Sequence, residues 1–247
     1  MRCMATLLLA LSFAAPAGAQ DLRRATVWDL KLGETVAAQP SAKEFRGFAC
    51  GSNGGAPRQP LIGFADFARC RPEAAGLREV YFEYDDEYEY IARARDLPRE
   101  IARWAGTTEV NFPVVVSALF DDAGVLQAIR VVTDARPDYR NETTEPELRK
   151  RTQAYLLGGV LAGRFDIEAA RDCKTLPPAE GESSVGTLLV KQICEKDDPA
   201  AGRKYLLQVN LYRKPGQSAV NPQAPTQLTQ GQFESSARLE IRQLAPR

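Results

Sequence analysis

The chain of 247 residues carries 32 basic and 32 acidic side chains and no histidine. A balanced charge excludes a dedicated nucleic-acid binder, which should carry a basic surface or a high isoelectric point. The absence of histidine excludes the commonest general base, the commonest metal ligand and every catalytic triad that depends on an imidazole. An apolar content of 44% is ample for a packed core and is not typical of disorder.

Residues 1–19 have the three parts of a secretory signal peptide. Arg2 precedes an apolar run at 5–11, and Ala17-Gly18-Ala19 supplies the small residues of a cleavage site. Cleavage there starts the mature chain at Gln20. No other stretch approaches the roughly 20 apolar residues that a transmembrane helix needs. We therefore expect a periplasmic or secreted protein with no transmembrane segment after cleavage.

The mature chain keeps four cysteines, an even number that suits an oxidising compartment. Of the three ways to pair them, we favour Cys50 with Cys70 and Cys173 with Cys194, which closes two loops of similar length. Each bond would stabilise the fold by about 3 kcal/mol in the chain-entropy model. A metal site is the alternative, but no C-x-x-C spacing is present. We predict structural disulfides, with no metal and no cofactor.

The first elements of the mature chain are short and interrupted. Trp28, Leu30 and Leu32 alternate with polar residues, which is compatible with a short strand. The glycine-rich segment that follows Cys50 is predicted to be a turn stapled by the first disulfide. The alternative for this segment, Gly51-Ser52-Asn53-Gly54-Gly55, is a nest of backbone N–H groups that binds an anion.

The run from Tyr81 to Tyr90 has the most unusual local composition, because acidic and aromatic residues alternate in it. Its first part predicts a half-buried strand, and a helix is slightly favoured after about Glu87. If the run were extended throughout, its carboxylates would share one face: Glu83, Asp85, Glu87 and Glu89. A solvated charged face is the favoured interpretation. The alternative is a partner surface made of Tyr81 and these four carboxylates.

Residues 112–133 contain the clearest predicted element, a β-hairpin. β-Branched residues fill both arms, and Gly124 supplies the positive φ that the turn needs. Asp121 and Asp122 at this turn resemble a fragment of a calcium loop, but the spaced ligands and the terminal glutamate of such a loop are missing. A turn is therefore the preferred interpretation.

A helix is predicted to begin at Thr144, which forms a capping box with Glu147. It would run to about Leu161 and end at Gly163. The pair Gly158-Gly159 inside it costs roughly 1 kcal/mol per glycine relative to alanine. The pair therefore implies either close packing against a neighbouring element or a shorter helix.

Three further strands are predicted at 185–193, 204–212 and 233–242, with a long polar loop before the last. The whole pattern predicts an α+β fold of antiparallel β-hairpins packed with one or two helices. A faint repeat, in which Cys70 and Cys194 each precede an Ala-Ala-Gly and a strand, favours two tandem modules over a single domain. The modules would be residues 20–137 and 144–247, each tied by its own disulfide.

The leading interpretation of function is an exported, non-catalytic protein that binds another protein or an envelope component. Nothing in the sequence requires an enzyme, and no G-x-S-x-G elbow surrounds a serine. The rival is a carboxylate-dependent hydrolase of envelope glycans, using two acids from a set of six: Glu83, Asp85, Glu87, Glu89, Asp121 and Asp122. Two carboxylates about 5–9 Å apart across a cleft would favour the enzyme.

Overall fold

The computed structural model describes residues 25–84, 95–97, 107–110, 112–134, 153–215 and 233–244. Its strands are β1 (Arg46–Cys50), β2 (Arg78–Glu83), β3 (Thr108–Glu109), β4 (Phe112–Phe120), β5 (Leu126–Thr133), β6 (Cys173–Thr175), β7 (Val190–Asp198), β8 (Arg203–Tyr212) and β9 (Glu234–Gln243). Its helices are all short: the 3-10 helices η1 (Val27–Asp29), η2 (Val36–Ala38), η3 (Ala42–Glu44), η4 (Phe64–Arg69) and η5 (Ala154–Leu156), and the α-helices α4 (Leu157–Arg164) and α5 (Ala169–Asp172). Within these ranges, no helix is long and apolar enough to span a membrane.

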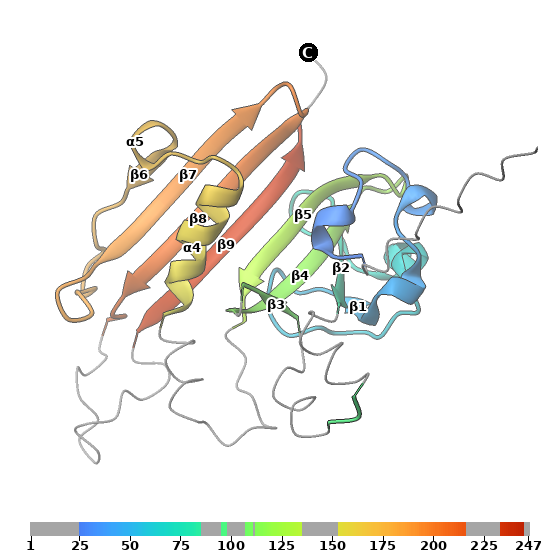
Figure 1. Cartoon of the computed structure of the whole chain (residues 1–247), viewed down its shortest axis with the longest axis horizontal. Helices are drawn as coiled ribbons and strands as arrows, with labels where there is room; N and C mark the ends of the chain where they lie inside the picture. Colours follow the sequence, from blue (N-terminus) through green and yellow to red (C-terminus); the bar gives the residue numbers. More distant parts are fainter. Residues whose placement is uncertain are drawn as a thin grey trace, which may run out of the picture.

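The strands form a single antiparallel sheet in the order β1-β2-β4-β5-β9-β8-β7-β6, and β3 adds to β4 (Figure 1). The predicted antiparallel, hairpin-rich architecture is therefore present. β5 and β9 pair from Ala128 with Arg242 to Val132 with Arg238, so strands from both halves of the chain share this sheet. The division into two modules stays a prediction, and its boundary at 138–143 lies outside the described residues.

The predicted hairpin is confirmed as β4 and β5, with Gly124 at φ +78° in its turn. The strand predicted around Trp28 is wrong, because Val27–Asp29 is a 3-10 helix. Thr26 and Asp29 form a capping box at the start of that helix. The Thr26 N–H donates to the Asp29 carboxylate at 2.7 Å, and the Trp28 N–H donates to the Thr26 hydroxyl. This local hydrogen bonding prevails over the alternation of apolar side chains.

The strand predicted at 185–193 is shifted toward the C-terminus, since β7 runs from Val190 to Asp198. Val185 and Leu188 bridge each other in a tight turn around Gly186, which delays the start of the strand. The helix that was predicted to end at Gly163 corresponds to α4, which ends one residue later, at Arg164. Its predicted start at Thr144 lies outside the described residues.

One face of the sheet carries the main core. Val80 and Phe82 of β2 and Tyr84 just after it lie in this core, as the alternation of apolar side chains predicted. The prediction of a half-buried strand is wrong, because Glu79 and Tyr81 on the opposite face of β2 are buried as well. Phe82 packs against a group of phenylalanines from β1 and its neighbouring turns, with ring centroids 4.9 Å from Phe45 and 5.3 Å from Phe64. Further along the same face, α4 covers β8 and β9 (Figure 1).

Close approach of α4 to the sheet explains why residue 158, the first of the glycine pair, has no side chain. A Cβ on Gly158 would lie only 2.4 Å from a methyl group of Val209 on β8. Gly159, on the other side of the helix, would meet nothing within 4 Å. The close packing that the glycine pair implied is therefore found at Gly158.

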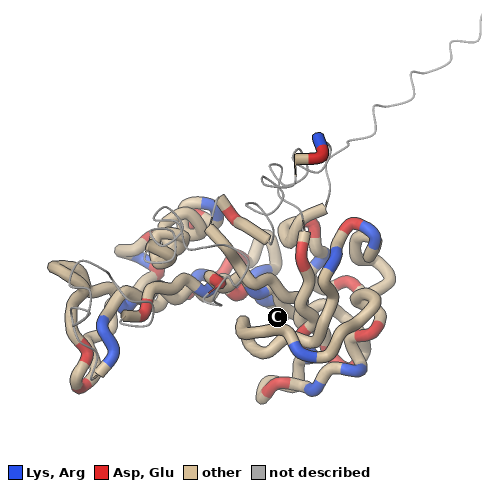
Figure 2. Tube along the Cα trace, turned by 90° about the horizontal axis from the view of Figure 1, so that it is seen from below, with Lys and Arg blue, Asp and Glu red and all other residues tan. Residues whose placement is uncertain are grey.

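The two ends of the sheet differ in how the strands are joined. At one end, here called the turn end, short turns join β4 to β5 and β7 to β8. At the other, here called the loop end, β2, β5 and β8 finish while β4, β7 and β9 begin. The connections 84–107, 134–153 and 213–233 all start at the loop end. Figure 2 looks onto this end, and basic and acidic residues are interspersed along the described trace.

Candidate functional site

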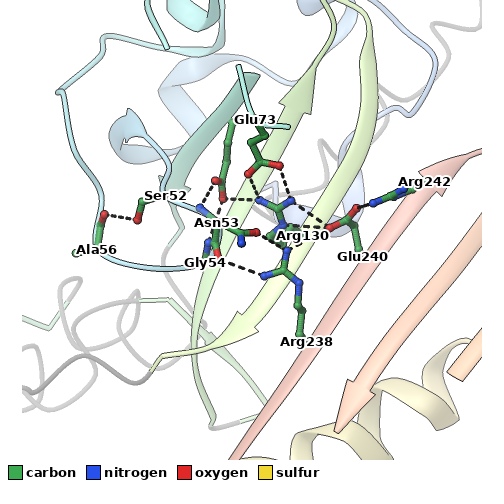
Figure 3. A network of polar contacts seen from close by, with 10 residues as sticks. Ser52, Asn53, Gly54, Ala56, Glu73, Arg130, Arg238, Glu240 and Arg242 are labelled. Atoms are coloured by element: carbon green, nitrogen blue, oxygen red, sulfur yellow. Dashed lines mark hydrogen bonds and ion pairs between the residues drawn. The ribbon is translucent and has the colours of Figure 1, made fainter. Parts of the chain in front are cut away.

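A cluster of charged side chains occupies the centre of the second face of the sheet (Figure 3). Because side chains alternate along a strand, Arg130 on β5 points away from the core that its neighbours Ile129 and Val131 join. Strand pairing places Glu240 of β9 directly opposite Arg130. We call the whole group the Arg130 network: Asn53, Gly54, Glu73, Glu79, Arg130, Arg238, Glu240 and Arg242.

Arg130 uses all three of its guanidinium nitrogens in this network. Glu73 accepts a forked pair of hydrogen bonds from Nη1 and Nη2, at 2.7 and 2.9 Å. Nη1 also lies 3.1 Å from Oε1 of Glu79, and Nη2 lies 3.1 Å from Oε2 of Glu240. Nε donates to Glu240 as well, at 3.2 Å. With only 3% of its side chain exposed, Arg130 is a buried cation shared by three carboxylates.

Glu79 is held from its other side by the backbone. The N–H groups of Asn53 and Gly54 donate to its carboxylate at 2.5 and 3.4 Å. Both residues have positive φ, +61° and +83°, which turns consecutive N–H groups inward. The glycine-rich segment is thus a turn tied by a disulfide, and its anion is a side chain of this protein. A Cβ on Gly54 would lie 2.7 Å from Val132, so the segment also packs tightly on β5.

The arginines of β9 complete the network. Arg242 donates from Nε to Glu240 at 2.6 Å. Arg238 donates to the side-chain oxygen of Asn53 at 2.6 Å and to its carbonyl at 3.1 Å. Three arginines and three glutamates cancel, so the network as a whole is neutral. It joins the segment after β1 to β9, the last of the described strands.

The charges within the network fix each other's ionisation. Hydrogen bonds from Arg130 lower the pKa of Glu73 below its ordinary value. Burial acts to raise the pKa of Glu240, but the charges of Arg130 and Arg242 outweigh burial and the pKa is lowered. In the same way, the surrounding carboxylates outweigh burial and raise the pKa of Arg130. The shifts at Glu73, Glu240 and Arg130 thus all favour the charged form of the group.

A second buried carboxylate, Glu109, lies at the junction of β3 and α4. It accepts hydrogen bonds from Trp28 Nε1 at 3.0 Å and from Arg164 Nη1 at 2.8 Å. The Arg164 guanidinium also stacks on the Trp28 ring, 4.4 Å from its centre. Burial, together with the charge of Glu109, raises the pKa of the Tyr84 hydroxyl. Glu109 therefore fastens the N-terminal segment and α4 to the sheet.

Both predicted disulfides are present, Cys50 with Cys70 and Cys173 with Cys194. The first closes the segment whose N–H groups hold Glu79. The second joins directly opposed residues of β6 and β7. Neither pair is free for redox or metal chemistry in this state. The described ranges also contain no group of three or more acidic or sulfur side chains arranged to hold a metal ion.

The structure describes only the first members of the acidic and aromatic run. Tyr81 is buried, and its hydroxyl donates to the Glu83 carboxylate at 2.5 Å. The other oxygen of that carboxylate pairs with Arg46 Nε at 3.4 Å. The remaining carboxylates, Asp85, Glu87 and Glu89, lie outside the described residues. Their role in a partner surface stays a prediction.

The aspartates of the hairpin turn have local partners. Asp121 accepts from the N–H groups of Ala123 and Val125, at 3.0 and 2.9 Å, so the turn interpretation holds. Asp122 pairs with Arg78 at the start of β2, whereas Glu83 lies at the end of that strand. Arg78, the partner of Asp122, and Glu83 are five residues apart along β2, which corresponds to roughly 17 Å of strand. This is too far for the carboxylate pair of a glycosidase.

Sequence reasoning missed the Arg130 network. Its only signal in the sequence is the placing of charged residues inside otherwise apolar strands, such as Arg130 between Ile129 and Val131. No protein-family model matches the chain, and comparisons with curated proteins and with solved structures also give no match.

Proposed function

We propose that this chain is an exported, non-catalytic protein that binds a protein partner through the loop end of its sheet. The observation that carries the proposal is the position of exposed apolar side chains. Four of the seven large ones in the described ranges lie at the loop end, with exposed fractions from 37% to 55%: Val110, Leu156, Leu176 and Leu188. Exposed apolar side chains that gather in one region of a surface are typical of interaction sites.

Strand pairing supports the placing of these four residues. Val110 lies between β3 and the start of β4. Leu156 follows Tyr155, whose N–H donates to Ser235 near the start of β9. The N–H of Leu176 donates to the carbonyl of Lys191, near the start of β7, and Leu188 precedes the same strand. The four residues thus follow the end of the sheet from β4 to β7.

The rest of the molecule is suited to hold such a surface rigidly. The network around Arg130 joins β2, β5 and β9. The first disulfide ties the segment before β2 to β1, and the second links the neighbouring strands β6 and β7. A rigid scaffold that carries long connections at one end is a common arrangement for recognition. The acidic and aromatic run enters the first of these connections, so Asp85, Glu87 and Glu89 remain candidate contributors.

Export is part of the same proposal. The signal peptide predicted at 1–19 would deliver the chain to a periplasmic or extracellular location, and two disulfides suit an oxidising compartment. We retain the α+β class and the division into two modules as finer proposals about the fold. The same experiment can address location and binding together.

Site-specific photocrosslinking tests this proposal. A photoreactive amino acid is placed at Val110 or Leu188 in the full chain expressed in its own host. Matched controls carry it at Asp122 and Pro199, which are exposed at the turn end. We expect one common protein crosslinked from Val110 and Leu188 in the exported fraction, and none from the controls. Crosslinks only from the turn end, or a chain that stays in the cytoplasm, would contradict the proposal.

A further inference from the structure

Glu73 differs from the other two carboxylates that bind Arg130. Glu79 belongs to β2 and Glu240 to β9, and their side chains are 3% and 7% exposed. Glu73 comes from the connection between Cys70 and β2, and 23% of its side chain is exposed. The network therefore has two members fixed by the sheet and one member that reaches it from a surface turn.

The contact between Glu73 and Arg130 depends on the carboxylate alone. Two parallel hydrogen bonds of 2.7 and 2.9 Å join its two oxygens to the two terminal nitrogens of the guanidinium. This forked geometry is available to any carboxylate that reaches Arg130. The backbone of Glu73 forms hydrogen bonds within its own turn: its N–H donates to the Leu77 carbonyl at 2.7 Å, and its carbonyl accepts from the Gly76 N–H at 2.8 Å.

The charge balance requires an anion at this position. Without Glu73, three arginines would face two glutamates, and a net positive charge would remain in a buried site. Arg130 would keep Glu79 and Glu240 but lose its forked pair of hydrogen bonds, and an uncompensated charge in a buried site is unfavourable. Ser117 lies opposite Arg130 on β4, and its buried hydroxyl has no hydrogen-bond partner. A free polar group thus lies on the neighbouring strand, on the same face as Arg130.

We propose that the Arg130 guanidinium is a carboxylate-binding site and that Glu73 is its exchangeable internal ligand. An external carboxylate takes the place of Glu73 by forming the same two hydrogen bonds, and the turn that carries Glu73 then leaves the sheet. The ligand class is a compound with a free carboxylate group, either a small acid or the C-terminus of a peptide. This site is independent of the loop end and of the function proposed for it.

The test uses Glu73→Ala and sodium acetate as the probe. Thermal unfolding is followed at pH 7 in acetate and in chloride of equal ionic strength. We expect the Tm of Glu73→Ala to rise by about 3–5 °C for each tenfold increase in acetate above its Kd. Asp122→Ala is the matched control, because it removes an exposed carboxylate that pairs with Arg78 outside the Arg130 network. Its Tm should be equal in the two salts.

Three further measurements decide the remaining cases. If Glu73→Ala unfolds in chloride, acetate should restore its far-ultraviolet circular dichroism; failure to do so, while Glu73→Gln folds, would overturn the site. In the wild-type protein, saturating acetate should speed the hydrogen exchange of backbone amides over residues 71–77 compared with chloride. Unchanged rates would overturn the proposal that acetate displaces Glu73. An acetylated dipeptide with a free C-terminus, compared with its amide, distinguishes a peptide ligand from a small acid.

Discussion

Replacing Gly158 or Gly159 by alanine should shift the free energy of unfolding in opposite directions, although the two residues are neighbours in α4. Alanine removes the entropic cost of glycine in a helix at both positions, a gain of about 1 kcal/mol. Only the Cβ at Gly158 meets an obstacle, with three atoms of Val209 at 2.4, 2.9 and 3.2 Å. At Gly159 nothing lies within 4 Å.

The size of the effect follows from these contacts. Valine is branched at Cβ and holds one rotamer strongly, so Val209 cannot turn away from the new methyl group. The distances place Gly158→Ala in the upper part of the range for overpacking, about 2–3 kcal/mol. After the gain in helix propensity, a net loss of about 1–2 kcal/mol is expected. Gly159→Ala should instead gain about 0.5–1 kcal/mol.

Urea denaturation of the disulfide-bonded protein measures both variants. The denaturation midpoint of Gly158→Ala should fall and that of Gly159→Ala should rise, with the dependence on urea unchanged. The double variant Gly158→Ala, Val209→Ala should be more stable than the sum of its two single changes predicts, because the collision is removed. If Gly158→Ala stabilises the protein as much as Gly159→Ala does, α4 does not pack on β8 in this way.

Three further predictions concern the buried charges and the cysteines. Glu79→Ala should cost about 3–5 kcal/mol of unfolding free energy, because it leaves Arg130 short of a partner, whereas Asp122→Ala, which removes an exposed carboxylate paired with Arg78, should cost less than about 1 kcal/mol; equal losses would remove the energetic role of the network. Acid should destabilise the protein: the lowered pKa values of Glu73 and Glu240 add stability above their ordinary pKa, near pH 4.3, and this stability is lost as the pH falls through the folded values. Unfolding measured from pH 7 to pH 3 checks this, and the dependence should be weaker in Glu73→Gln. Peptide mapping without reduction should yield the linked pairs Cys50–Cys70 and Cys173–Cys194, and replacing the first pair by alanines should cost about 3 kcal/mol; a free thiol would contradict the pairing.

Elements with strong local signals could be predicted from the sequence. The hairpin of β4 and β5 follows from its β-branched arms and from Gly124, and the alternation along β2 correctly assigned Phe82 to the core. Two local predictions went wrong where hydrogen bonds within a turn outweigh side-chain alternation. One is the capping box at Thr26, and the other is the bridge between Val185 and Leu188, which moves the start of β7.

The Arg130 network could not be predicted because its parts meet only through the order of the strands. Glu79, Arg130 and Glu240 lie far apart in the sequence, and nothing local indicates that β9 inserts between β5 and β8. The nest at Asn53 and Gly54 was a stated alternative, but the sequence did not identify its anion. Only the assembled sheet shows that Glu79 fills it.

The position of β9 has a consequence for the order of folding. β9 follows all the other described strands in the sequence, yet it lies between β5 and β8 in the sheet. Until β9 docks, β5 and β8 each present an unpaired edge, and contacts such as that between Arg130 and Glu240 span 110 residues. Closing so long a loop makes this step slow, and open edges favour aggregation while it lasts. Any truncation that removes β9 should therefore leave two incomplete sheets that associate with other chains.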